Sequence, residues 1–395
     1  MKRVCGLDVH KDTIFACVRK GNYQTEVRTF STFSCGLEEL KHWLKGEHVN
    51  RVAMESTGVY WMPVWRALED DFDLLLVNPY FIKQAPGRKT DVKDAQWIAQ
   101  LLDKGMLKGS LVPEKTIRVL RLYLRRYVQL QGQMTRCLQQ IERHFSQCNI
   151  KIASLTSTIN SKTVIDILAC IVEGKHTVDD LVALVHPRIK NSKGEKVKQS
   201  LEGIIEAHDV FLLRQIYEDY QHINRQCYEL LAQAEKLADE QYKEQIELLQ
   251  TIPGIKKLSA VFIWAELGGN IELFENANRL TGWCGLRPNN DESAGKIKSR
   301  KIGKGNKYLR RILVQTGWAA SRTKNCYLKS KYEQLAIRKG NKKALIAIAR
   351  KQLVITYNVL SKKEKYQEPK VALSEKQIER KRKYYEEKLT KLKQQ

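Results

Sequence analysis

The segment RVCGLDV at residues 3–9 is a short apolar run that meets an acidic side chain, Asp8, near its end. A second stretch of the same character, residues 49–55, contains the run RVAM at 51–54 and ends in Glu55. Short apolar runs rich in β-branched residues and bounded by turn signals predict buried strands. Two such strands, each ending in a carboxylate, predict an acidic site at the edge of a sheet.

The neighbouring sequence extends this pattern into a complete domain. Alternating or β-branched stretches predict further strands at 13–18, 25–30 and 72–77, and apolar residues at helical spacing predict helices at 37–44 and 64–68. Three strands followed by alternating helices and strands fit a mixed α/β sheet of the RNase H-like type. We therefore expect an RNase H-like domain over residues 1–110.

Two more acidic residues, Asp91 and Asp94, are three positions apart and would share one face of a helix. With Asp8 and Glu55 they give four carboxylates. Hard cations such as Mg²⁺ prefer oxygen ligands, and a two-metal site for phosphodiester cleavage needs several acids. Four neighbouring carboxylates would also repel one another without a cation. The set predicts Mg²⁺-dependent cutting of nucleic acid by Asp8, Glu55, Asp91 and Asp94.

Simpler interpretations exist for each residue alone, and Asp8 and Glu55 would then be turn residues at strand ends. Thr90 or Asp91 would serve as a helix N-cap, and Asp94 would favour the helix dipole, with no metal at all. The basic pair Arg88 and Lys89 fits either contacts to substrate phosphates or local counter-charges. The metal interpretation therefore depends on all four carboxylates together.

The composition indicates the substrate. A formal net charge of +25 is typical of a protein that neutralises phosphates, and most of the excess lies outside the charged residues 361–395. Nine cysteines without a C-x-x-C pair predict reduced thiols and disfavour zinc. The apolar stretch 258–267 contains Glu266 and is too short for a membrane helix, so we expect a cytoplasmic protein without a membrane partner.

Apolar residues follow a heptad pattern over 117–145 and again over 213–237. Both segments predict long coiled-coil-type helices that pair either within one chain or between chains. Gln131 falls at a core position, where a polar residue helps to fix register or partner number. We expect a helical linker over 111–245, with an insert at about 150–210 to which no chemistry is assigned.

The third block, residues 246–360, is mainly helical in pattern. The segment IPGI at 252–255, followed by an apolar helix, predicts a helix-hairpin-helix element that presents backbone amides to phosphate. Residues 361–395 form a charged tail. Residues 287–311 hold nine basic and two acidic side chains, which fits either a phosphate track or a solvated basic face. The track would comprise Lys296, Lys298, Arg300, Lys301, Lys304, Asn306, Lys307, Arg310 and Arg311.

Several of these segments together resemble the DEDD insertion-sequence transposases of the IS110 family, the bridge-RNA-guided recombinases. In the first domain the matching segments are GLDVHK at 6–11, ESTGVY at 55–60, NP at 78–79 and KTDVKDA at 89–95. In the third block they are IPGI at 252–255, GLRP at 285–288, ESAGK at 292–296 and GNKYLRR at 305–311. The resemblance extends to about residue 360.

The resemblance implies a RuvC-like first domain with the acidic tetrad, a coiled-coil linker that builds dimers and a tetramer, and a transposase domain with a nucleophilic serine. Ser293 matches that serine. It further implies that domains of different protomers form a composite site, and that a structured bridge RNA pairs with donor and target DNA. The protein would act at the nucleoid in the prokaryotic cytosol.

The hypothesis from sequence is an RNA-guided DNA recombinase with a Mg²⁺-assisted serine nucleophile. Ser293 also lies in a turn-rich stretch where serine commonly caps the backbone. Two alternatives stay open: a RuvC-like junction-resolving nuclease in which water attacks the phosphate, and a non-catalytic nucleic-acid-binding scaffold.

Overall fold

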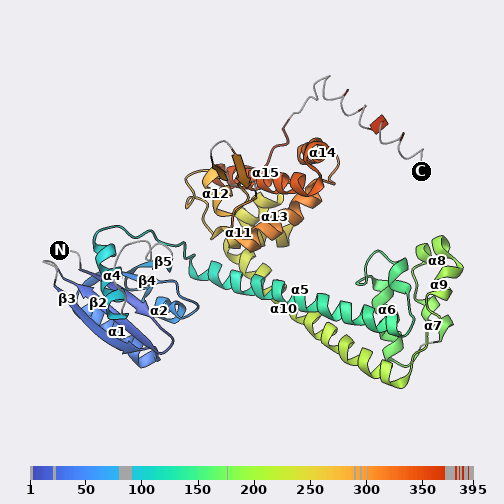
Figure 1. The fold of residues 1–395 in the computed structure, drawn as a ribbon, viewed down its shortest axis with the longest axis horizontal. Helices are drawn as coiled ribbons and strands as arrows, with labels where there is room; N and C mark the ends of the chain where they lie inside the picture. The colour runs from blue at the N-terminus through green and yellow to red at the C-terminus, as the bar shows by residue number, and fades with distance from the viewer. Residues whose placement is uncertain are drawn as a thin grey trace. The chain divides into compact units, whose positions relative to one another are not determined.

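The computed structural model describes residues 3–20, 24–79, 91–175, 177–288, 291–293, 296–299 and 301–369, with a few single residues of the tail. The chain divides into two compact units, residues 1–113 and 114–395 (Figure 1). The predicted segments 111–245 and 246–360 therefore lie almost wholly in one unit. Among all the residues that the structure describes, no helix has the length and apolar character needed to span a bilayer.

The first unit is built on a five-stranded sheet with the order β3-β2-β1-β4-β5. The strands β1 (Arg3–Val9), β2 (Thr13–Arg19) and β3 (Thr25–Ser31) pair antiparallel, whereas β4 (Val49–Glu55) and β5 (Asp73–Val77) continue parallel to β1. Three antiparallel strands extended by two parallel ones give the mixed sheet of the RNase H-like fold. The predicted fold class of this domain is confirmed.

Helices cover both faces of the sheet. The helices α1 (Ser34–Gly46) and α2 (Trp61–Leu68) share a core with alternate residues of β1, among them Leu7. The helix α4 (Asp91–Asp103) packs on the opposite face, where Val4 belongs to its core. Because side chains alternate along a strand, positions 4, 6 and 8 of β1 face α4.

The second unit contains the two predicted long helices, α5 (Lys115–Gln147) and α10 (Ala207–Gln250). They lie side by side and antiparallel within the chain (Figure 1), with Gln131 Nε2 donating to Cys227 Sγ at 3.8 Å midway along the pair. Gln131 therefore contacts the partner helix of its own chain. Oligomerisation stays a prediction.

The region between these helices, which the sequence left without an interpretation, is helical. It contains η1 (Ile152–Leu155), α6 (Lys162–Val172), α7 (Val178–Ala183), α8 (Pro187–Lys193) and α9 (Glu195–Gln199). Buried residues such as Ile167 and Leu181 share one core with the adjoining halves of α5 and α10. The insert is thus packed on the end of the helical pair.

The remainder of the unit folds on the other end of the pair. It comprises α11 (Lys257–Leu267), α12 (Ala277–Trp283), a hairpin of β6 (Asp291–Ser293) and β7 (Lys296–Ser299), α13 (Lys307–Ala320), α14 (Tyr327–Lys339) and α15 (Asn341–Lys362). Buried residues of α5, α10, α11, α12, α13 and α15 form its main core.

The predicted helix-hairpin-helix turn joins α10 to α11. Gly254 has φ +85°, and a Cβ there would lie 2.3 Å from the Thr316 carbonyl oxygen of α13. The Pro253 carbonyl accepts a hydrogen bond of 2.9 Å from Gln352 Nε2 on α15. The turn is therefore held against two helices of its own unit, and a phosphate contact there stays a prediction.

Candidate active site and nucleic-acid interface

Strand pairing places Asp8 beside Glu55. Leu7 of β1 is paired with Met54 of β4 in parallel register, so the two acids follow as neighbours at the carboxyl ends of adjacent strands. Ala53, two positions before Glu55, packs in the core under α4. By the alternation of side chains, both carboxylates belong to the sheet face that α4 covers.

A close helix–strand contact brings Asp94 to the same place. Gly6 lies against α4 so tightly that a Cβ would be 2.3 Å from the Ala99 amide nitrogen and 2.4 Å from the Ala95 carbonyl oxygen. Ala95 and Ala99 are fully buried at this contact. Since Asp94 directly precedes Ala95, the contact at Gly6 holds the backbone of Asp94 close to the strand that carries Asp8.

Substitution of Gly6 by alanine is expected to displace α4, because the added carbon would meet backbone atoms that cannot rotate away. We expect a loss of stability of about 1–3 kcal/mol and a larger loss of Mg²⁺-dependent cleavage in molecules that remain folded. Chemical denaturation and a cleavage assay measure the two effects. Gly46→Ala is the control, since nothing lies within 4 Å of a Cβ there. Equal activity of both variants would contradict this role of Gly6.

The electrostatics of Asp8 show that the three acids interact. Burial raises the pKa of Asp8, and the negative charges of Asp94 and Glu55 raise it further, while His10 opposes this shift. His10 Nε2 lies 3.0 Å from Asp8 Oδ2. A site that disfavours its own carboxylate charges in this way is suited to a cation.

The sequence interpretation assigned no role to two residues that contact these acids, Thr57 and His10. Thr57 Oγ1 donates a hydrogen bond of 2.8 Å to Glu55 Oε1, and His10 contacts Asp8 as described. Both lie two residues beyond the acid that they touch. That spacing at a strand end is the signal by which sequence reasoning could have found them.

The other residues predicted for this site are placed only in part. Asp91 opens α4, three positions before Asp94, but its side chain lies outside the described part of the structure. The predicted contacts Arg88 and Lys89 fall outside the described residues altogether. Their roles stay predictions.

Ser293 is the last residue of β6 and pairs with Lys296 at the start of β7. The backbone at Ser293 therefore lies where the hairpin turns, while its side chain is outside the described set. The same holds for the side chains of Lys296 and Lys298 and for all of Arg300. Ser293 and the three clustered carboxylates belong to different compact units.

The basic segment after the hairpin is described from residue 301 onward. Lys301, Lys304, Lys307 and Arg311 are exposed. Arg310 instead donates from Nη1 to the Gly303 carbonyl at 3.2 Å and so holds the loop. Their exposure fits both a phosphate track and a solvated basic face, so the track stays a prediction.

Asn306 has a structural task that the sequence interpretation did not include. Its Oδ1 caps α13 by accepting from the amides of Tyr308 and Leu309 at 3.0 and 3.1 Å, and its Nδ2 donates to Glu266 Oε2 at 2.7 Å. The two amides are therefore satisfied within the protein. Asn306 was expected to belong to the phosphate track, but both polar ends of its side chain are bonded within the protein.

Glu266, which seemed only to interrupt an apolar stretch, is the centre of a buried network. Arg125 donates to both carboxylate oxygens at 2.9 and 2.8 Å, and Arg121 donates to the carbonyls of Ala265 and Glu266 at the end of α11. Together with Asn306, the network joins α5, α11 and the start of α13. It thereby positions the helix that follows the basic loop.

The pKa of Glu266 lies below its ordinary value: burial raises it, but Arg125, Asn306 and Arg121 lower it more. Because the pKa of Glu266 is lower in the folded than in the unfolded protein, its charge stabilises the fold at pH values above the unfolded-state pKa of 4.5. This stabilisation is lost as the pH falls through the folded-state pKa. Glu266→Gln is expected to lower the free energy of unfolding by about 3 kcal/mol near neutral pH. Urea denaturation should show that the difference in free energy of unfolding between wild type and Glu266→Gln becomes smaller below pH 4.5. A difference that stays constant in acid would contradict this account.

Two family models of transposases match the chain. A DEDD-type transposase model of the IS110 group matches residues 5–150, and the model of the transposase IS116/IS110/IS902 family matches residues 246–333. The two ranges together cover more than half of the chain and include the acids, the hairpin and the whole basic segment 287–311.

Curated relatives carry related descriptions. The transposase for insertion sequence element IS1111A of Coxiella burnetii is 30% identical over 131 residues, which are 31% of this chain and 35% of that protein, so the match spans about a third of that relative. The pilin gene-inverting proteins of Moraxella bovis and Moraxella lacunata are each 24% identical over 373 residues, 91% of this chain and 96% of theirs.

Among solved structures, T. thermophilus RuvC in complex with a Holliday junction substrate aligns with 28% of this chain and all of its own. The TM-score is 0.22 and the identity 14%, a likeness too slight to support any inference. The assignment of the fold depends on the strand order described above.

Proposed function

Since the chain belongs to the IS110 family of transposases, we propose that it is the recombinase of an insertion sequence, which cuts and rejoins DNA strands under the guidance of a structured RNA. The observation that supports this most strongly is that Asp8 and Glu55 end adjacent parallel strands of an RNase H-like sheet on the face covered by α4, and that the charges of Asp94 and Glu55 act on Asp8. Family membership accounts for the transposase class, and the RNA guidance and the nucleophile are the proposed additions.

The acidic face fits a divalent metal. Its donor atoms are carboxylate oxygens, the type that Mg²⁺ prefers, and the mutual repulsion that raises the pKa of Asp8 is what a bound cation would relieve. Asp8, Glu55 and Asp94 would hold the ion, with Asp91 as the fourth ligand. When bound, Mg²⁺ would supply charge stabilisation at the scissile phosphate.

The protein residues around the acids have supporting roles. The hydrogen bond from Thr57 orients one oxygen of Glu55, and His10 restrains one oxygen of Asp8, so that each keeps its other oxygen for the ion. The close approach of α4 at Gly6 holds Asp94 in place.

Ser293 is the proposed nucleophile. Its Oγ would attack the phosphorus, forming a serine–phosphate ester while the bond to a sugar oxygen breaks, and the serine proton would end on the released sugar hydroxyl. A sugar hydroxyl of the exchanged strand would then attack the same phosphorus and regenerate the serine. The phosphoester energy is conserved, so strand exchange needs no external energy source.

The exposed basic residues Lys301, Lys304, Lys307 and Arg311 lie shortly after the hairpin in the chain and would contact the sugar-phosphate backbone. Because such contacts carry no sequence information, target choice would fall to base pairing by the bridge RNA. The acids and Ser293 lie in different compact units, so we propose that units of different protomers meet in a dimer or tetramer.

The test is a joining assay with purified protein, donor DNA, target DNA and the noncoding RNA that flanks the gene. We expect joined DNA only when the RNA and Mg²⁺ are both present. Cleavage that needs Mg²⁺ but not RNA would favour a junction-resolving nuclease instead. Nucleic-acid binding without any cleavage would favour the scaffold.

A further inference from the structure

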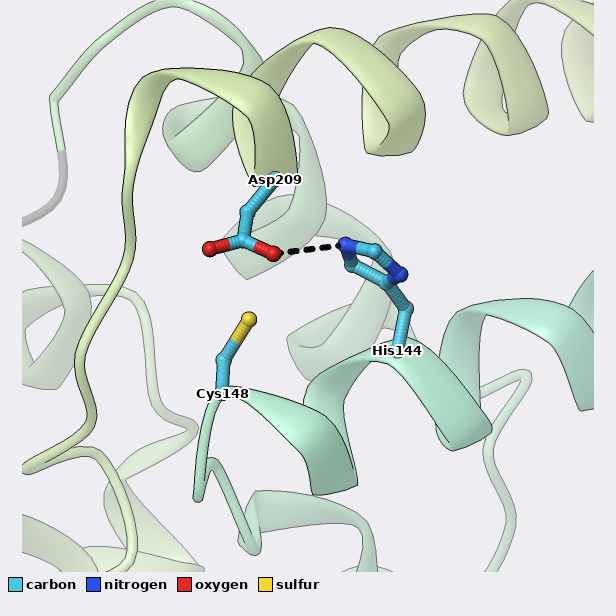
Figure 2. A group of neighbouring side chains, drawn as sticks. All are labelled: His144, Cys148 and Asp209. Carbon is cyan, nitrogen blue, oxygen red and sulfur yellow. Dashed lines mark ion pairs between the residues drawn. The ribbon is translucent and has the colours of Figure 1, made fainter.

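A second cluster of ligand-type side chains lies far along the helical pair from the basic loop, where α5 ends and α10 begins. We name it the arm-tip cluster: His144, Cys148 and Asp209 (Figure 2). One ligand atom of each residue lies within 4.8 Å of those of the other two. Figure 2 shows the thiol and the imidazole pointing toward the carboxylate from the neighbouring helix.

The geometry of the cluster follows from the two helices. His144 and Cys148 are four residues apart at the end of α5, so their side chains share one face. Asp209 lies in the first turn of α10, where Oδ2 accepts from the Glu206 amide at 2.9 Å. This bond turns Oδ1 toward His144 Nε2, which is 3.1 Å away.

The backbone around Cys148 is also fixed. The Ile204 amide donates to the Cys148 carbonyl at 3.0 Å, and a Cβ on Gly203 would lie 2.3 Å from the same oxygen. The segment that leads into α10 is therefore pressed onto the end of α5. The three ligands are held together by packing that does not depend on their own contacts.

The cluster is buried and its imidazole is incompletely satisfied. Cys148 is 3% exposed, and His144 Nε2 is a buried atom that makes no hydrogen bond of acceptable geometry, despite its short ion-pair distance to Asp209. His208 lies beside the cluster on the solvent side, with Nε2 3.5 Å from Asp209 Oδ1. His208 could therefore supply a fourth ligand, which would be the second imidazole nitrogen of the site.

A thiol, an imidazole and a carboxylate are ligands for a borderline-soft metal, whereas Mg²⁺ and Ca²⁺ take oxygen alone. We propose that the arm-tip cluster binds Zn²⁺ through His144, Cys148 and Asp209, with His208 or water as the fourth ligand. The ion would link the start of α10 to the end of α5, and so hold together the two ends of the insert that lies between these helices. This site is separate from the acidic face and does not depend on the proposed recombination.

Binding involves no electron transfer. Burial, with the charge of Asp209, raises the pKa of Cys148 to about 11, so the metal-free thiol carries its proton. As the sulfur–zinc bond forms, that proton passes to solvent. The sequence expectation against zinc was based on the absence of C-x-x-C pairs, and these ligands come instead from two helices far apart in the chain.

The test uses the full-length protein in millimolar Mg²⁺, so that the acidic face is already supplied with its own metal. Titration with Co²⁺ should give a sulfur-to-cobalt charge-transfer band that saturates at one equivalent and is displaced by Zn²⁺. Zn²⁺ at a hundredfold excess over its Kd should raise the Tm by about 3–5 °C.

Cys148→Ala should lose both the band and the Tm shift, while Cys170→Ala, a matched change in the insert outside the cluster, should keep both. His144→Gln keeps the thiol and should weaken Co²⁺ binding at least about tenfold, which covers the case that Cys148→Ala does not fold. A band that persists in Cys148→Ala, or wild type without a band or Tm shift, would overturn the proposal. The cluster would then be a metal-free cap of α10.

Discussion

Replacement of Ser293 by alanine is expected to abolish strand joining and the covalent protein–DNA intermediate, with a loss of rate of about a thousandfold or more. The variant loses the only atom that would form the ester with phosphorus, and no other change of charge or size accompanies it. Ser293 ends β6 at the turn of a short hairpin, so the change should leave the fold intact. The joining assay with donor DNA, target DNA and RNA measures the effect.

Ser299→Ala on the paired strand β7 provides the control for this prediction, since it removes a hydroxyl from the same hairpin. We expect near wild-type joining for that variant. Full recombination by Ser293→Ala would exclude the serine as nucleophile. Retained cleavage without joining would favour attack by water.

Asp8→Asn is expected to reduce Mg²⁺-dependent cleavage by at least about a hundredfold. Loss of a residue that only orients a metal ligand typically lowers metal affinity or activity about ten- to a hundredfold, and loss of a ligand itself should cost at least as much. The amide keeps the shape of the side chain but removes the charge that would hold the ion. It also removes repulsion with Asp94 and Glu55, so the metal-free variant should be no less stable than wild type. Cleavage rates across a Mg²⁺ titration, together with urea denaturation, measure both effects.

The matched control is Asp103→Asn at the other end of α4, where the carboxylate pairs with Arg19 at 2.8 Å. This variant undergoes the same change of charge on the same helix and should cleave at nearly the wild-type rate. If the two variants lose activity equally, the effect is one of overall charge, and Asp8 is not a ligand.

The sheet of the first unit could be predicted because its strands are short, apolar and bounded by turns. Strands were expected at 3–9 and 49–55 and are found at Arg3–Val9 and Val49–Glu55. Helix length was underestimated where the heptad spacing is interrupted but the helix continues. For example, α10 runs from Ala207 to Gln250 rather than over 213–237, and its heptad pattern ends near the non-helical Tyr242.

The candidate site could be predicted only as a list of residue types. That Asp8 and Glu55 are neighbours follows from parallel pairing of two strands, but the approach of Asp94 depends on Gly6, whose importance appears only when the helix is in place. Likewise, Asn306 was expected to contact nucleic acid, while its side chain is bonded at both ends within the protein. Contacts between distant segments are not encoded in local spacing.

The most direct test of the account is to map the covalent intermediate. Wild-type protein, the flanking RNA, Mg²⁺ and donor and target DNA are incubated, stopped in denaturant, digested and analysed by mass spectrometry. The account predicts a nucleotide attached through phosphate to the peptide that contains Ser293, formed only with the RNA present and absent from Asp8→Asn. Cleaved DNA with no attached peptide, or a nucleotide attached at another residue, would contradict it.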